Sequence, residues 1–374
     1  MGFGKAIPLK EIILPIGISF YTFQGITYIV DLFRGEVEVQ KNPLKIALYI
    51  SLFPQLVAGP IIRYKDIARQ IDDRSLNVDL FYSGAVRFIF GLGKKVIIAN
   101  NVAAIADAVF SSPADTHSIS TAWLGAICFA LQLYFDFSGY SDMAIGLGKM
   151  FGFEFRENFN YPYISRNIRE FWRRWHISLS SFFRDYLYIP LGGNRRGNVY
   201  FNLIIVFAAT GLWHGAGWTY IVWGLWHGLF IIIENVIKRT PTLARIAEKA
   251  TAPIFRIFTH IYALLVILIG WVIFRSESIS YAAAFLKNMF SFSPSGNIRV
   301  STLYYLDSFH ALVLGAAIML SLPLYPKLAE WIRTKNHNMG MFSVLHIICL
   351  GILLVVSMLM IINQGYNPFL YFRF

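Results

Sequence analysis

The residues best suited to chemistry in this chain are the histidines of a repeated pentapeptide. Gly-Leu-Trp-His-Gly occurs at 211–215 and again at 224–228, which places His214 and His227 13 residues apart. On one continuous helix this spacing corresponds to about 220° of rotation, so the two rings would face away from each other. We therefore expect no shared metal ion, and the sequence holds no His-x-His or His-Glu-x-x-His spacing.

His214 is the stronger candidate for a general base. It lies at a glycine-rich break, formed by Gly211, Gly215 and Gly217, between two short apolar segments. Glycines at such a break let backbone or substrate approach closely. An imidazole with an unperturbed pKa of about 6.5 can take the proton of an attacking hydroxyl near neutral pH. His227 lies inside a fuller apolar segment, and we interpret it as a packing residue.

A second polar group follows the apolar run at 121–135. Two carboxylates, two hydroxyls and a phenol stand within seven residues: Asp136, Ser138, Tyr140, Ser141 and Asp142. Such groups need partners at membrane depth, because an unpaired buried polar group is costly. Two interpretations stay open. The group binds substrate directly, or it forms a network that joins helices and pairs with the arginines of the segment described next.

The segment 154–198 differs from the apolar runs on either side of it. It holds eight arginines, no lysine and many aromatic residues, with His176 at its centre. This pattern is typical of helices that lie in a membrane interface, with rings at the headgroup level and guanidinium groups that reach water. A basic surface anchor would explain the charges, but it would not explain His176.

The elements that must position these residues are membrane helices. The chain has 374 residues, of which 56% are hydrophobic and only 14% charged, and its mean hydropathy is +0.53. A soluble domain has about 25% charged residues. The composition therefore excludes disordered and fibrous chains and predicts an all-α polytopic membrane protein. We assign the net charge of +12 to cytoplasmic loops under the positive-inside rule, and we do not expect nucleic-acid binding.

Runs without charge and of about 18 residues or more mark candidate spans. They occur at 12–30, 257–274, 309–326 and 341–363, and less regular segments occur at 46–62, 81–110, 121–135, 199–213 and 217–233. The pattern predicts about eight to ten membrane segments, some broken or re-entrant, with interfacial helices between them. Irregular backbone at membrane depth is tolerated only where protein buries it or water reaches it, so we expect an internal site.

Several strings together resemble the membrane-bound O-acyltransferase family, and within it the branch that O-acetylates alginate. The longest is Phe171-Trp-Arg-Arg-Trp-His-Ile-Ser-Leu-Ser180, and the others lie at 14–24, 54–62, 134–144, 160–163, 184–195, 211–215 and 369–374. The resemblance covers essentially the whole chain, so we expect residues 1–374 to form one such domain. Family members usually carry several further membrane helices before the segment that here begins at Leu14, and we expect this chain to lack them.

The resemblance implies transfer of an acyl group onto a hydroxyl, with His214 as the family's membrane histidine and His176 as a second functional histidine. Acetyl-CoA would be the donor, reaching the site from the cytoplasm, and no tightly bound cofactor is expected. Either His176 or backbone N–H groups at 211–217 would stabilise the developing oxyanion. Further substrate-binding residues would be Arg173, Arg174, Trp175 and Asn194.

The resemblance also implies a setting. The protein would lie in the bacterial inner membrane and would serve a polysaccharide acceptor such as alginate. We expect 154–198 on the cytoplasmic side for a separate reason, because its arginines are close to membrane segments, where the positive-inside rule operates. A separate periplasmic acetyltransferase would complete the transfer. Two alternatives stay open: D-alanyl transfer to teichoic acid, and a transporter whose histidines relay protons. The string at 188–195 looks more like the acetyltransferase branch.

Overall fold

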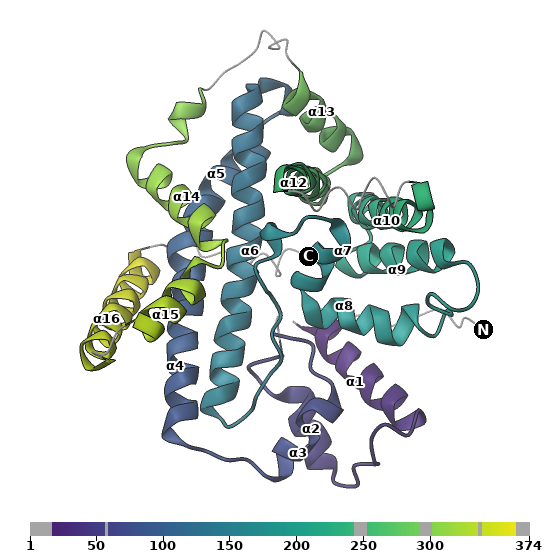
Figure 1. Cartoon of the computed structure of the whole chain (residues 1–374), viewed down its shortest axis with the longest axis vertical. Helices are drawn as coiled ribbons and strands as arrows, with labels where there is room; N and C mark the ends of the chain where they lie inside the picture. Colours follow the sequence, from purple (N-terminus) through teal and green to yellow (C-terminus); the bar gives the residue numbers. More distant parts are fainter. Residues whose placement is uncertain (1–16, 57–58, 243–252, 292–300, 336–338, 364–374) are drawn as a thin grey trace, which may run out of the picture.

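The structure is a computed structural model of the chain. It describes residues 17–56, 59–242, 253–291, 301–335 and 339–363 (Figure 1), and every regular element in these ranges is a helix. In chain order they are α1 (Ile18–Phe33), α2 (Pro43–Ser51), α3 (Tyr64–Asp72), α4 (Val78–Gly93), η1 (Lys94–Ala99), α5 (Asn100–Phe110), η2 (Ala114–Thr116), α6 (Ile119–Met150), η3 (Pro162–Ile164), α7 (Ile168–Arg174), α8 (Ile177–Phe183), η4 (Arg184–Tyr188), α9 (Val199–His214), α10 (Trp218–Arg239), α12 (Pro253–Arg275), α13 (Ile279–Phe290), η5 (Thr302–Tyr304), α14 (Ser308–Leu320), α15 (Leu324–Lys335) and α16 (Met339–Asn363).

Five of these helices are long and apolar enough to cross a membrane, which agrees with a polytopic membrane protein. They are Val78–Phe110, Ile119–Met150, Trp218–Arg239, Ile254–Arg275 and Ser343–Asn363. A sixth is counted if α14 and α15, which are bent by 67° at a short break, form one span. The predicted count of eight to ten is not confirmed by the described residues. Part of the predicted span at 12–30 lies outside them.

The central helix is α6, and it is longer than the sequence indicated. The apolar run at 121–135 continues without a break through the polar stretch at 136–142, so that α6 has 32 residues. Within its most apolar window 78% of the residues are buried inside the protein. In Figure 1 α6 lies between α4 and α5 on one side and α12 on the other. Polar residues at membrane depth are tolerated where they face such a protein interior.

Glycines allow α4 and α6 to pack closely. A methyl group added at Gly84 would lie 2.6 Å from the carbonyl oxygen of Gly146, and one added at Gly91 would lie 2.6 Å from that of Gly139. Small residues at facing positions let membrane helices approach until their backbones are in contact. This contact fixes how the polar residues of α6 face those of α4 and η1.

The repeated pentapeptide has a packing explanation. The first glycine of each copy, Gly211 on α9 and Gly224 on α10, contacts a backbone oxygen of the other helix and leaves no room for a side chain. Directly after His214, Gly215 adopts a φ of 151°, which favours glycine, and α9 ends there. The two histidines therefore lie on separate helices, not on the single helix assumed in the spacing argument.

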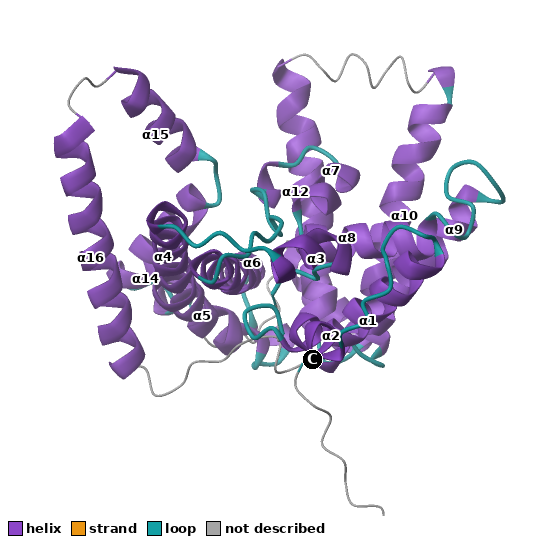
Figure 2. Ribbon diagram, turned by 90° about the horizontal axis from the view of Figure 1, so that it is seen from below, coloured by secondary structure: helices purple, strands orange, loops and turns teal. Residues whose placement is uncertain are grey.

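Helices α14, α15 and α16 form a group on the side of α4 and α6 that faces away from α10 and α12 (Figure 2). The apolar window of α16 is only 11% buried. A helix with so much apolar surface outside the protein is suited to contact lipid.

The arginine-rich segment folds as short helices packed into the protein. Its rings were predicted to lie at the headgroup level, and this is wrong for the largest of them. Phe171, Trp172 and Trp175 belong to the main hydrophobic core, with exposed fractions of 0%, 9% and 4%. Paired aromatic rings contribute about 0.5–1.5 kcal/mol beyond their area burial, and here these rings lie around the histidines.

Candidate active site

His176 occupies an unusual backbone conformation. It precedes α8 with a φ of 41° and a ψ of 57°, and in the described ranges only one other non-glycine residue, Tyr161, has a positive φ. Left-handed backbone is uncommon outside glycine and costs on the order of 1 kcal/mol or more. The surrounding structure holds His176 in this conformation, which often marks a functional residue.

The hydrogen bonds of Asn158 determine which nitrogen of His176 carries the proton. The Ser178 backbone N–H donates to Asn158 Oδ1 at 3.1 Å, and the Ser178 hydroxyl donates to the same oxygen at 2.9 Å. This fixes Oδ1 as the atom that lies 3.2 Å from His176 Nδ1. An amide oxygen only accepts, so Nδ1 must donate and Nε2 must carry the free lone pair.

The environment of His176 keeps it neutral. Burial lowers its pKa well below the usual value of about 6.5, and a charge on His214 would lower it further. Nε2 is buried and has no hydrogen-bond partner within the described part of the chain. His176 therefore presents an unprotonated nitrogen, which suits proton acceptance rather than donation.

His214 ends α9 among aromatic rings. Trp223 and Phe274 each lie edge-on to its ring, with centroids 5.1 Å away. A small cavity of about 10 Å³ lies against His214, Phe137 and Trp175. The Phe137 ring also contacts that of His176, with centroids 4.6 Å apart. The two histidines predicted to be functional thus share one aromatic environment, although 38 residues separate them in the sequence.

His227 is enclosed differently. It is fully buried in α10, and Trp172 and Trp223 contact its ring at centroid distances of 5.3 and 5.5 Å. Neither of its ring nitrogens has a hydrogen-bond partner among the residues that the structure describes. The interpretation of His227 as a packing residue stays a prediction.

A cavity of about 330 Å³ brings together two of the predicted substrate-binding residues, Arg173 and Asn194. Arg169 and Arg184 also line it, and Ile177, which directly follows His176, forms part of its wall. Arg184 pairs with a neighbouring aspartate. Arg173 is exposed and makes no hydrogen bond or ion pair with any described residue. Judged on the described part of the chain, the cavity therefore offers a free guanidinium group at Arg173, which can bind an anionic group such as phosphate.

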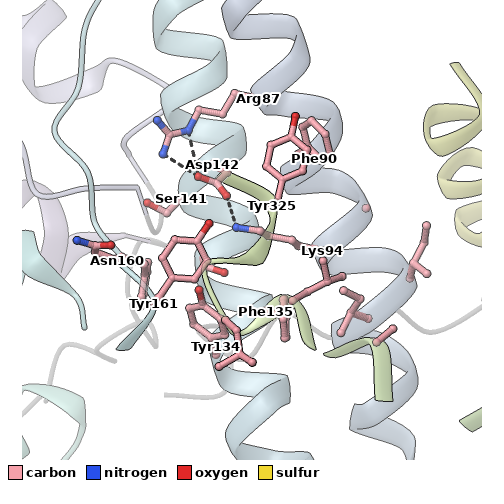
Figure 3. Close-up of a pocket in the computed structure, with 18 of the residues that line it drawn as sticks. Arg87, Phe90, Lys94, Tyr134, Phe135, Ser141, Asp142, Asn160, Tyr161 and Tyr325 are labelled. Atoms are coloured by element: carbon pink, nitrogen blue, oxygen red, sulfur yellow. Dashed lines mark hydrogen bonds and ion pairs between the residues drawn. The ribbon is translucent and has the colours of Figure 1, made fainter. Parts of the chain in front are cut away.

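A larger cavity, of about 870 Å³, lies between α4, α6 and α14–α16. Ser138, Ser141 and Asp142, all predicted to bind substrate, line it. Figure 3 shows Ser141 and Asp142. At one end Asp142 accepts hydrogen bonds from Arg87 at 2.8 Å and from Lys94 at 2.6 Å. The remaining wall is mainly apolar.

The charge pairing of α6 corrects one interpretation. Asp136 and Asp142 do not pair with the arginines of 154–198. Asp136 pairs with Lys95 at 2.5 Å, and Asp142 pairs with Arg87 and Lys94. The reason is the close α4–α6 contact, which places the basic residues of α4 and η1 directly opposite the carboxylates. η1 is a π-helix, a feature often found at functional sites.

Three other predicted site residues lie outside both cavities. Arg174 pairs with Glu170 and donates to a backbone oxygen, so it has a structural role. Tyr140 packs against the cluster that contains Phe137. Trp175 is buried and lines only the small cavity beside His214. From the sequence, these three residues were predicted to bind substrate together with the residues that line the two cavities.

Sequence reasoning missed Asn158, which fixes the His176 tautomer, and the basic partners Lys94, Lys95 and Arg87. A signal was present for the basic residues, because they interrupt the apolar run at 81–110 and a charge at membrane depth needs a partner. No comparable signal distinguishes Asn158 from its neighbours.

Comparisons with known proteins identify the family of this chain. Residues 37–274 match the membrane-bound O-acyltransferase family. The chain is 43% identical, over 98% of its length, to a Pseudomonas putida protein named "Probable alginate O-acetylase AlgI", of which it covers 76%. The Pseudomonas aeruginosa protein of that name is 50% identical over 76% of this chain and 53% of its own. The peptidoglycan O-acetyltransferase of Helicobacter pylori is 40% identical, over 75% of this chain and 57% of that protein.

A multi-pass helical protein with histidines among aromatic rings, and with charged and hydroxyl groups in neighbouring cavities, is thus placed among membrane acyltransferases. The chain belongs to the membrane-bound O-acyltransferase family, as the motifs predicted. The family is one of O-acyltransferases, so the enzyme class of the chain is O-acyltransferase. The chain spans only 53% of the Pseudomonas aeruginosa relative and 57% of the Helicobacter pylori relative.

Proposed function

We propose that this chain transfers an acetyl group from acetyl-CoA, bound on the cytoplasmic side, for O-acetylation of a polysaccharide such as alginate. The observation that carries this proposal is the arginine-lined cavity, whose wall includes Ile177, the residue directly after His176. Acetyl-CoA carries several phosphates, and guanidinium groups bind phosphate bidentately. The free Arg173 would hold a phosphate at the mouth of the cavity, and the thioester would point inward.

His214 is the proposed general base. It removes the proton of the acceptor hydroxyl as the hydroxyl oxygen attacks the acetyl carbonyl carbon, the carbon–sulfur bond breaks, and the leaving thiolate takes up the proton. A positioned base contributes about 10²–10⁴ in rate. His176 Nε2 offers a second proton acceptor. Because its tautomer has no N–H at Nε2, backbone N–H groups at 211–217 are the better candidates for stabilising the oxyanion.

We also propose the orientation and the partner. The segment 154–198 faces the cytoplasm of a bacterial inner membrane, and a periplasmic acetyltransferase receives the acetyl group for delivery to the polysaccharide. Arg195, exposed and close to the arginine-lined cavity in sequence, offers a place to test this. A cysteine at this position should resist an impermeant thiol reagent in intact cells and react after permeabilisation.

The protein reconstituted in lipid nanodiscs and given radiolabelled acetyl-CoA tests the proposal. Release of free coenzyme A, with the label moving to an acceptor, is the expected result. Activity with a D-alanyl carrier-protein thioester in place of acetyl-CoA would favour teichoic acid D-alanylation. Proton-driven solute uptake in vesicles, without acetyl transfer, would favour a transporter.

A further inference from the structure

The larger cavity is not used by the proposed transfer, and its walls differ from those of the arginine-lined cavity. Its lining is dominated by apolar side chains from the membrane helices, among them Phe90 on α4, Phe135 on α6, Val313 and Leu320 on α14, and Leu353 on α16. Its volume of about 870 Å³ lies within the range of about 300–1,000 Å³ that is usual for small-molecule sites.

One wall of the cavity comes from helices that leave much apolar surface outside the protein. α14 and α16 form one wall, and α16 is the candidate span with the least burial, at 11%. These two helices lie C-terminal to the segment that matches the family. Such apolar surface is suited to contact lipid, so this wall would lie next to bilayer lipids.

One end of the cavity is polar and carries hydroxyl groups without partners. Ser138 and Ser141 are each 2% exposed, and neither hydroxyl has a hydrogen-bond partner among the residues that the structure describes. Both line the cavity. A buried hydroxyl left without a partner costs about 1–3 kcal/mol, so a ligand that supplies the missing partner would bind there favourably.

The charges at this end balance. Arg87 and Lys94 are matched by Asp142 and Glu157, and hydrogen bonds or ion pairs join all four (Figure 3 shows the first three). An anionic or a cationic headgroup would therefore meet no unpaired opposite charge in the cavity. The free energy that such a headgroup loses when it leaves water would not be offset by an ion pair. A neutral group that donates and accepts hydrogen bonds would not have this cost.

From these observations we propose that the larger cavity binds a bilayer lipid, with an alkyl chain along the apolar wall and a neutral, hydroxyl-bearing head at Ser138 and Ser141. A saccharide fits less well, because the apolar wall would leave most of its hydroxyls unpaired. The two cavities share Ile177 as a lining residue. The inference does not rest on the proposed acetyl transfer, because it is argued from the apolar wall and the two serine hydroxyls alone.

The test uses the full chain in nanodiscs and photoreactive alkyl probes of equal length. The probes carry a diazirine in the chain and end in an alcohol, a sulfate or a trimethylammonium group. We expect the alcohol to label peptides of α4, α6 and α14 more strongly than either charged probe. Equal or stronger labelling by a charged probe, or labelling of these peptides by a diazirine-bearing oligosaccharide in place of the alcohol, would overturn the proposal.

A matched pair of variants on α14 locates the site. Ala316 lines the cavity and is exposed to it, whereas Ala311 is exposed on the same helix but does not line it. Ala316→Phe should reduce labelling by the alcohol by about tenfold, equivalent to the loss of roughly two methylene contacts. Ala311→Phe should leave labelling unchanged. Equal labelling of the two variants, at matched thermal stability, would contradict the assignment. Coenzyme A release, measured in parallel, should be the same in both.

Discussion

The buried ion pair between Asp136 on α6 and Lys95 on η1 gives a stability prediction of definite size. The carboxylate and ammonium atoms are 2.5 Å apart, and the side chains are only 3% and 9% exposed. Asp136→Asn removes the negative charge and leaves the ammonium group in a site with little access to water. Breaking such a pair on one side costs about 3–5 kcal/mol, a large part of the roughly 5–15 kcal/mol that stabilises a typical domain. We therefore expect lower abundance in the membrane and a lower melting temperature in detergent.

Two further variants make this result interpretable. Asp136→Asn combined with Lys95→Met should recover most of the stability, because replacing both partners of a buried pair is often neutral. Asp72→Asn, which breaks a pair whose aspartate side chain is 52% exposed, should cost only about 0–1 kcal/mol. The reasoning is refuted if the double variant is no more stable than the single one. Normal abundance of Asp136→Asn with lost acetyl transfer would instead place Asp136 in the active site.

Three further predictions concern the histidines and the arginine-lined cavity. Arg173→Gln should raise the KM for acetyl-CoA by about tenfold or more with little change in kcat, since a charged hydrogen bond contributes about 1.5–3 kcal/mol. Arg195→Gln, at an exposed position, is the control, and equal KM values for the two variants would contradict the assignment. His227→Phe should keep both stability and acetyl transfer, whereas His227→Ala should have a lower melting temperature because it leaves a cavity. Loss of acetyl transfer in well-folded His227→Phe would show that this residue is catalytic. Burial lowers the pKa of His176 in the folded protein. Below about pH 6.5 the unfolded chain therefore binds a proton on this imidazole that the folded protein does not bind, and the free energy of unfolding should fall by up to about 2 kcal/mol at pH 5. His176→Gln should show a smaller fall in melting temperature between pH 7 and pH 5, and an unchanged fall would count against a neutral His176.

The sequence was informative where one local pattern decides the structure. Long uncharged runs predicted the helices at 257–274 and 341–363. The run at 309–326 was predicted as one regular span, but the structure bends it by 67° between α14 and α15. The glycine-rich break after His214 also exists, because Gly215 needs a backbone conformation that other residues avoid. The family followed from motifs spread along the whole chain.

The sequence was uninformative where the structure depends on how distant segments face each other. Asp142 and its partner Arg87 are 55 residues apart, and their pairing follows from the glycine contacts of α4 and α6. Asn158 reaches His176 only because the loop between α6 and α7 returns to the start of α8. The aromatic residues of 154–198 have a composition that suits an interface or a core equally well, and only their packing decides between the two.

The central claim is that His214 is the general base of acetyl transfer. The most direct test compares purified wild type with His214→Ala in nanodiscs, with coenzyme A release and acetyl transfer measured at saturating acetyl-CoA. We expect His214→Ala to insert normally into the membrane, because one half-buried imidazole contributes little to the packing of so many apolar residues, and to lose at least about 99% of the transfer rate. His227→Phe serves as the folded control. Acetyl transfer by His214→Ala at more than a small fraction of the wild-type rate would contradict the assignment.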